Sequence, residues 1–145
     1  MNRTIPALST VSALAVLGLT VAAAPTAAAA PAVASAPTCG PSVRMINRLN
    51  IVCVTVDGPS VRAYGVSTQL APGSGRSFIY KVSATVLGGE SLGTESGSAY
   101  LGSGTAYIGG PSGVVPCGST VRASFSLTDF GTPPPTSVVD VVVTC

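Results

Sequence analysis

The stretch from Cys117 to Cys145 holds two runs of alternating apolar and polar residues, a proline-rich connection between them and a cysteine at each end. Alternation with a period of two is typical of a strand that packs on one side and faces water on the other. We therefore expect an antiparallel strand pair here, with Arg122, Asp129 and Asp140 facing solvent. The side chains expected to face the core are Val121, Ala123, Phe125, Leu127, Val139, Val141 and Val143.

Other stretches carry the same strand signal. β-Branched residues fill positions 51–56, and positions 60–69 and 77–87 also have strand character, whereas 35–41 has the composition of a loop and 42–50 fits neither period. Gly and Pro recur too often to leave room for a helix. The sequence therefore predicts an all-β fold, a small antiparallel β-sandwich of roughly six to eight strands that is immunoglobulin-like in the broad sense.

A repeated motif contains two of the four tyrosines. Gly-Ser-Ala-Tyr-Leu-Gly at 97–102 is echoed by Gly-Thr-Ala-Tyr-Ile-Gly at 104–109. The offset would put Tyr100 and Tyr107 on opposite faces of one continuous strand, so two short strands joined by a turn at 102–104 are expected.

The first 34 residues have the pattern of a secretory signal peptide. Arg3 precedes an apolar run from Ala13 to Ala24 and a stretch rich in alanine and proline. Cleavage after Ala34 fits the small-residue rule, and cleavage after one of Ala28 to Ala30 is the competing site. The alternative is an uncleaved membrane anchor, but such a helix needs about 20 apolar residues, and serines and threonines interrupt this run.

Cleavage would leave residues 35–145 as one secreted domain of about 110 residues. All four cysteines lie in it, and an even count in a small exported chain points to disulfides rather than metal ligands. The chain has seven lysines and arginines against five acidic residues, and it contains no run of like charge. We therefore expect no nucleic-acid partner, and no membrane partner after cleavage.

The four cysteines allow three pairings. We favour Cys39 with Cys53 and Cys117 with Cys145, because each pair is local and begins with the same Cys-Gly turn. The rival joins Cys53 to Cys117 and Cys39 to Cys145. A Cys53–Cys117 bridge would cross two sheets as in immunoglobulin domains, but the chain lacks the tryptophan that packs against such a bridge.

The favoured second pair has a geometric difficulty. If Thr128 lies opposite Val138, Cys117 lies four residues beyond the position opposite Cys145, a separation of roughly 13 Å. A disulfide needs Cα atoms within about 7 Å. Either the chain turns back at Gly118 or the strand register differs.

A short disulfide loop followed by a longer one in a secreted β-sandwich is similar to the small bacterial α-amylase inhibitors of the tendamistat type. Residues 35–39, Ser-Ala-Pro-Thr-Cys, are similar to the approach to the first disulfide of that family. The inhibitory Trp-Arg-Tyr segment of the family lies between its first two cysteines, where this chain has Asn-Arg-Leu-Asn at 47–50. The resemblance covers the cysteine layout and carries over no inhibitory residue.

Catalytic chemistry has few candidate residues. The chain has no histidine, so a Ser-His-Asp or Cys-His site cannot be built. Lys81, the only lysine, lies on the polar side of a predicted strand, and Glu90 and Glu95 are neighbours only through a predicted loop. We expect no enzyme, no cofactor and no metal site.

A binding role has better candidates. Tyr64, Tyr100 and Tyr107 lie beside glycines in stretches of small residues, and exposed tyrosines suit contact with a protein or a glycan. Alternatively, one or two of them cover the open ends of the sandwich.

Arg44, Arg48 and Arg62 could form a small basic face, or each could be a solvated residue at a strand edge. The expected function is that of a small secreted, non-catalytic protein that binds an extracellular partner, for example as an inhibitor of a secreted enzyme. The alternative is a structural or surface-active cell-envelope protein that self-assembles through its valine-rich strands.

Overall fold

The computed structural model describes residues 35–129 and 134–145, so the expected signal peptide at 1–34 lies outside the described residues. The described part is all-β, with nine strands in two antiparallel sheets and no helix. None of these residues forms a helix of the length and apolarity that crossing a membrane requires.

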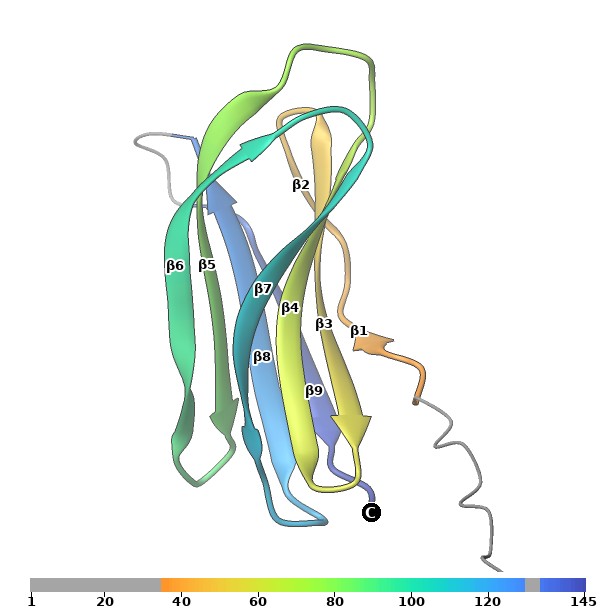
Figure 1. Ribbon diagram of the computed structural model, residues 1–145, viewed down its shortest axis with the longest axis vertical. Helices are drawn as coiled ribbons and strands as arrows, with labels where there is room; N and C mark the ends of the chain where they lie inside the picture. Colours follow the sequence, from red (N-terminus) through yellow and green to blue (C-terminus); the bar gives the residue numbers. More distant parts are fainter. Residues whose placement is uncertain (1–34, 130–133) are drawn as a thin grey trace, which may run out of the picture. The chain divides into compact units, whose positions relative to one another are not determined.

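The first sheet has the strand order β1-β3-β4-β7, and β2 also pairs with β3. Its strands are β1 (Thr38–Cys39), β2 (Val43–Met45), β3 (Arg48–Asp57), β4 (Ser60–Gln69) and β7 (Thr105–Val114). The second sheet has the order β6-β5-β8-β9, and β8 and β9 lie behind β4 and β3 in Figure 1. Its strands are β5 (Arg76–Val86), β6 (Ser91–Leu101), β8 (Thr120–Thr128) and β9 (Thr136–Val142).

Side chains from both sheets share one hydrophobic core, so the two sheets form a sandwich-like arrangement. Val52 and Val54 of β3 are buried in the same cluster as Phe78 and Val82 of β5. The predicted inward residues of β8 and β9 are confirmed: six are buried, and Val139 is partly buried against the core.

Two stretches without a clear pattern in the sequence contain short strands. The predicted loop at 35–41 includes β1, and the ambiguous segment at 42–50 forms β2, a two-residue turn at Ile46-Asn47 and the start of β3. β1 and β2 take the count of strands above the expected six to eight. Each is two or three residues long, which is too short to show a period.

The repeated tyrosine motifs form two strands, as expected, but these strands lie in different sheets. β6 pairs with β5, whereas β7 pairs with β4. The turn at 102–104 therefore carries the chain from one sheet to the other. Gly104 has a φ of 84°, which favours glycine at this position.

The register of β8 and β9 removes the difficulty with the second disulfide. Ser124, not Thr128, lies opposite Val138, so the expected register is wrong by four residues. Continuing the observed register brings Cys117 opposite Cys145, and their Cα atoms are 5.7 Å apart in the disulfide.

Both disulfides follow the favoured pairing. Cys39 and Cys53 are direct cross-strand partners with Cα atoms 4.0 Å apart, and Cys117 is bonded to Cys145. Gly118, at a φ of 85°, donates its N–H to the carbonyl of Val143 at 2.8 Å, so the chain also bends where the sequence indicated.

Candidate functional site

The outward side of β4 and β7 carries two tyrosines that lie close together. The rings of Tyr64 and Tyr107 have centroids 6.4 Å apart and planes tilted by 42°. Tyr64 lies opposite Gly109, which has no side chain to separate the two rings. Tyr107 is 74% exposed and Tyr64 is half-buried, so the pair presents aromatic surface to solvent.

A hollow of about 330 Å³ adjoins the tyrosine pair, and a second hollow of about 360 Å³ shares part of its wall. Thr55 and Arg62 line both of them, the tyrosines line the first, and the exposed Val114 lines the second. We call the surface formed by these five residues the tyrosine face: Thr55, Arg62, Tyr64, Tyr107 and Val114.

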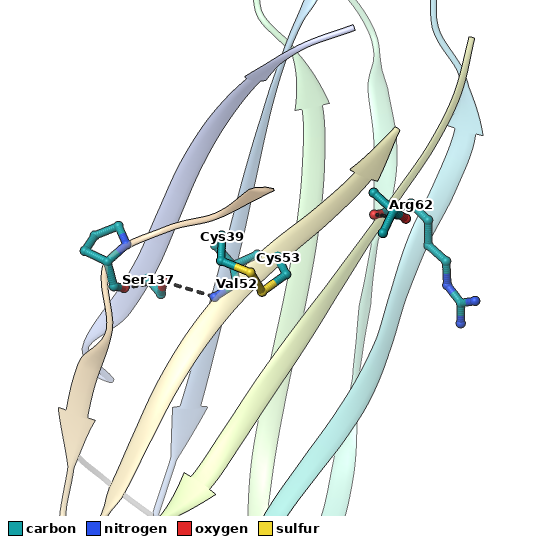
Figure 2. Close-up of a disulfide and its surroundings, with 7 residues drawn as sticks. Cys39, Val52, Cys53, Arg62 and Ser137 are labelled. Atoms are coloured by element: carbon teal, nitrogen blue, oxygen red, sulfur yellow. Dashed lines mark hydrogen bonds between the residues drawn. A yellow bond between two sulfur atoms is a disulfide. The ribbon is translucent and has the colours of Figure 1, made fainter. Parts of the chain in front are cut away.

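Arg62 is exposed and makes no ion pair with any carboxylate in the described part of the chain, which includes every Asp and Glu of the sequence. Figure 2 shows its side chain extending away from the neighbouring disulfide. Thr55 donates a hydrogen bond to the Arg62 carbonyl at 3.5 Å, the long end of the range. The guanidinium is therefore available to an acceptor on another molecule.

The Cys39–Cys53 disulfide lies beside the tyrosine face. Cys53 is opposite Cys39 on one side and opposite Tyr64 on the other. The disulfide fixes β1 to β3 (Figure 2), and its Cys53 is the residue of β3 that pairs with Tyr64. The strand that pairs with β4 at Tyr64 is therefore tied covalently to β1.

A serine of the second sheet closes the gap between β1 and β2. The N–H of Val52 donates to the Ser137 hydroxyl at 3.1 Å, and that hydroxyl donates to the Pro41 carbonyl at 2.7 Å (Figure 2). The chain passes so close to β9 here that a Cβ on Gly40 would lie only 2.6 Å from the Val138 carbonyl oxygen. Ser137 thus satisfies a buried backbone donor that no strand reaches.

Tyr100 does not join the other two predicted binding tyrosines. It lies on β6 of the second sheet, opposite Ser77, and it is 71% exposed. Its ring lies over Gly75, where an added Cβ would be 2.7 Å from the ring. The three candidate tyrosines therefore occupy two surfaces, because the turn between the repeats changes sheets.

Arg48 fits neither interpretation of the three arginines, a small basic face or solvated residues at strand edges. Arg44 and Arg62 are exposed, but Arg48 is 2% exposed and lies on the inward side of β3. Its position has the same parity as Val52 and Val54, so counting back from these valines would have placed it inward. The ambiguous pattern of 42–50 concealed this signal.

The two glutamates considered as a catalytic pair are far apart. Glu90 lies in the turn before β6, whereas Glu95 lies within β6 opposite Val82, not in the loop that the sequence indicated. Five residues of extended chain span roughly 16 Å. A glycosidase pair needs about 5 to 9.5 Å. The described residues contain no group of three or more potential metal ligands of the His, Cys, Asp or Glu type.

Glu95 instead borders the tyrosine face. Its carboxylate oxygen lies 3.9 Å from the position that a Cβ on Gly109 would take. The face thus combines two aromatic rings, an exposed arginine and a nearby carboxylate, and Tyr and Arg are enriched among the residues that dominate binding energy in protein interfaces. The sequence matches no model of a known protein family and no curated protein.

Proposed function

We propose that this is a small secreted, non-catalytic protein that binds an extracellular protein through the tyrosine face. The observation that carries the proposal is the Tyr64–Tyr107 pair, 6.4 Å apart and flanked by an arginine without an ion-pair partner in the described part of the chain. The adjoining hollows offer space for side chains of a partner. A secreted enzyme, inhibited by the contact, is the partner class we favour.

Export and fold class belong to the same proposal. The pattern of residues 1–34 supports a signal peptide, and two disulfides are typical of an oxidising extracellular environment. Two antiparallel sheets around one core support a sandwich that is immunoglobulin-like in the broad sense. The lack of histidine and the separation of Glu90 from Glu95 support a role without catalysis.

Capture from the native culture medium tests the proposal, with Tyr100 as a matched control. The double variant Tyr64→Ala/Tyr107→Ala removes the aromatic pair, whereas Tyr100→Ala removes a tyrosine of similar exposure from the other sheet. The wild type and Tyr100→Ala should retain a partner that mass spectrometry identifies, and the double variant should lose it.

The purified partner then separates the remaining possibilities. Equal affinity for all three proteins would refute the tyrosine face as the binding surface. Loss of capture after enzymatic deglycosylation of the medium would show a glycan in place of a protein. If the partner is an enzyme, its inhibition should disappear with the double variant.

A self-assembling envelope protein is the alternative. Val138 and Val142 face outward on β9 with 39% and 54% exposure, on either side of Asp140. Concentrated protein that forms fibres or films and binds amyloid dyes would favour this alternative over a soluble inhibitor. A soluble monomer without dye binding would refute it, and Asp140→Val is the variant most prone to assemble.

A further inference from the structure

Arg48 is a buried cation whose hydrogen-bond acceptors are all neutral. Its Nε donates to the Ser67 hydroxyl at 2.7 Å, and Nη2 donates to the Ser67 carbonyl at 3.1 Å. Nη1 donates to the Gly102 carbonyl at 3.0 Å and to Gln69 Oε1 at 3.4 Å. The arginine therefore links β3 and β4 to the turn between the sheets, but no partner balances its charge.

No carboxylate of the chain pairs with Arg48. Every Asp and Glu lies in the described part of the sequence, where the ion pairs join Arg76 to Asp129 at 2.6 Å and Arg122 to Asp140 at 2.7 Å. Buried charges are normally paired, because an isolated ion loses its hydration at a cost of several kcal/mol. Burial lowers the pKa of Arg48, in keeping with a charged form that lacks an anion.

Arg48 also forms part of the wall of a hollow of about 360 Å³. Ile46, which is 53% exposed, supplies apolar surface, whereas Phe78 and Leu101 lie behind the wall at 1% and 4% exposure. Arg76 lies on the same wall. The guanidinium carbons of Arg48 and Arg76 lie 6.0 Å and 5.7 Å from the centroid of the Phe78 ring. The volume is at the lower end of the range for small-molecule sites, about 300 to 1,000 Å³.

The charges around this hollow leave one positive charge without a partner. Asp129 pairs with Arg76, and Arg48 has no carboxylate. A ligand with a single negative charge would complete the balance, whereas the carboxylate of Asp129 would repel a second negative charge on the ligand.

The backbone at the rim is strained. Ile46, which lines the hollow, has a φ of 54° although it is β-branched. The turn between β3 and β4 has nearly the same φ, 53°, at its first position, but there the residue is Gly58, which adopts this conformation without strain. Strain of this kind clusters at ligand-binding sites, where the surrounding structure maintains it.

We propose that this hollow, the Arg48 pocket, binds a small monocarboxylate. The carboxylate accepts from Arg76 and from the one Nη2–H of Arg48 that no described residue accepts, and the apolar part of the ligand lies against Ile46. Arg76 suits this ligand because the planar N–H groups of an arginine match the two oxygens of a carboxylate. The pocket is lined by other residues than the tyrosine face, so the proposal does not depend on partner binding there.

Three probes that differ in charge and in apolar surface test the pocket on the exported protein with both disulfides intact. Sodium benzoate carries one charge and an apolar ring, benzamide is its neutral analogue, and sulfate carries two charges without apolar surface. In ¹H–¹⁵N NMR titrations at constant ionic strength, benzoate should give saturable shifts at the Arg48 Nε–H and at the Gly73 and Ser74 amides. Benzamide and sulfate should bind at least about tenfold more weakly.

Each other outcome of the titration would overturn the proposal. Equal binding of benzamide would mean that the hollow accepts any flat apolar molecule. Equal binding of sulfate would mean an unspecific cationic surface. Shifts that fail to saturate with benzoate would mean that the charge of Arg48 serves the structure alone.

Variants with opposite expected effects separate binding from folding. Arg76→Gln should weaken benzoate binding about tenfold, because one charged hydrogen-bond donor is lost. Asp129→Asn should strengthen it severalfold, because the competing anion is removed. Lys81→Gln removes the same charge at an exposed position of β5 outside both sites and should leave the affinity unchanged. Equal weakening by Lys81→Gln, or no gain from Asp129→Asn, would overturn the assignment.

Discussion

The outward sides of the two sheets are built from similar strands, but they differ in whether the arginine on them has a carboxylate partner. On the second sheet, Arg122 and Asp140 lie directly opposite and form two hydrogen bonds of 2.8 and 2.7 Å. The hydroxyls of Ser83 and Ser124 are 2.7 Å apart on the same side. On the tyrosine face, Arg62 has no carboxylate partner in the described part of the chain.

This difference indicates which surface suits a partner. An interface over these paired residues would first have to desolvate or break pairs that already satisfy each other, with little gain from replacing them. We call that surface, with Ser83, Arg122, Ser124 and Asp140, the polar face. The tyrosine face has aromatic area and a free guanidinium to offer, so the same burial would form new interactions.

Removing the disulfides should give the largest effect and shows how far each sheet depends on covalent support. Cys117→Ser/Cys145→Ser opens a loop with a sequence separation of 28, which corresponds to about 3.6 kcal/mol in the chain-entropy model. Cys39→Ser/Cys53→Ser opens a loop with a sequence separation of 14, which corresponds to a loss of about 3.0 kcal/mol of stability. Urea unfolding measures both losses. A clearly smaller loss for the first variant would mean that the polar face itself holds β8 to β9.

Ser137→Ala should cost about 2 kcal/mol, because the buried N–H of Val52 loses its acceptor. This serine joins the sheet of the tyrosine face to the edge of the sheet that carries the polar face. Ser126→Ala, on the outward side of the neighbouring strand, is the control and should change the free energy of unfolding by less than about 0.5 kcal/mol. Equal effects in urea unfolding would show that water replaces the Ser137 hydroxyl.

Ser83→Ala and Tyr107→Ala compare the two faces directly. The serine variant should lose about 1 kcal/mol of stability, because the Ser124 hydroxyl loses its partner. The tyrosine variant should stay within about 0.5 kcal/mol, because the ring is mostly exposed. Thermal unfolding of the two variants gives the order. The reverse order would assign Tyr107 to covering the sandwich rather than to binding.

The smallest expected effect is a pH dependence on the polar face. A hydrogen bond from Arg122, together with its charge, holds the pKa of Asp140 below its usual value. The folded pKa is thus lower than the unfolded value of about 3.9, so the pair stabilises the fold above that pH and loses its effect as pH falls through the folded pKa.

Asp140→Asn tests this dependence. The difference in stability between the wild type and the variant should be largest near neutral pH and shrink as pH falls below about 4. Urea unfolding at low ionic strength resolves it best, because the pair is exposed and salt screens it. A difference that stays constant with pH would show that the ion pair contributes nothing.

Alternation along the sequence was sufficient to predict what lies within single strands. It identified the inward side chains of β8 and β9, and the local spacing of the cysteines favoured the pairing that the structure has. Both signals are local, since side-chain direction follows from parity and a short loop favours its own closure.

Relations between strands were not encoded in the same way. The register of β8 and β9 differs from the expected one by four residues, an even shift that keeps every side chain on its side of the sheet, so alternation could not reveal that the Thr128–Val138 pairing was wrong. Tyr100 and Tyr107 share a motif, but the turn at 102–104 sends them to different sheets. The burial of Arg48 agrees with its position at an even spacing from the inward Val52 and Val54, but a charged residue gives no hydrophobic signal that would predict burial.

The two disulfides close separate loops, one ending at Cys53 and the other beginning at Cys117. Neither encloses the chain between them, which contains β4 to β7. Under a pulling force applied to the two ends of the protein, this middle segment would extend by about 22 nm with both disulfides intact. Reduction of each disulfide under load would then release a further step of about 5 or 10 nm. The length of the step would identify which disulfide had been cleaved.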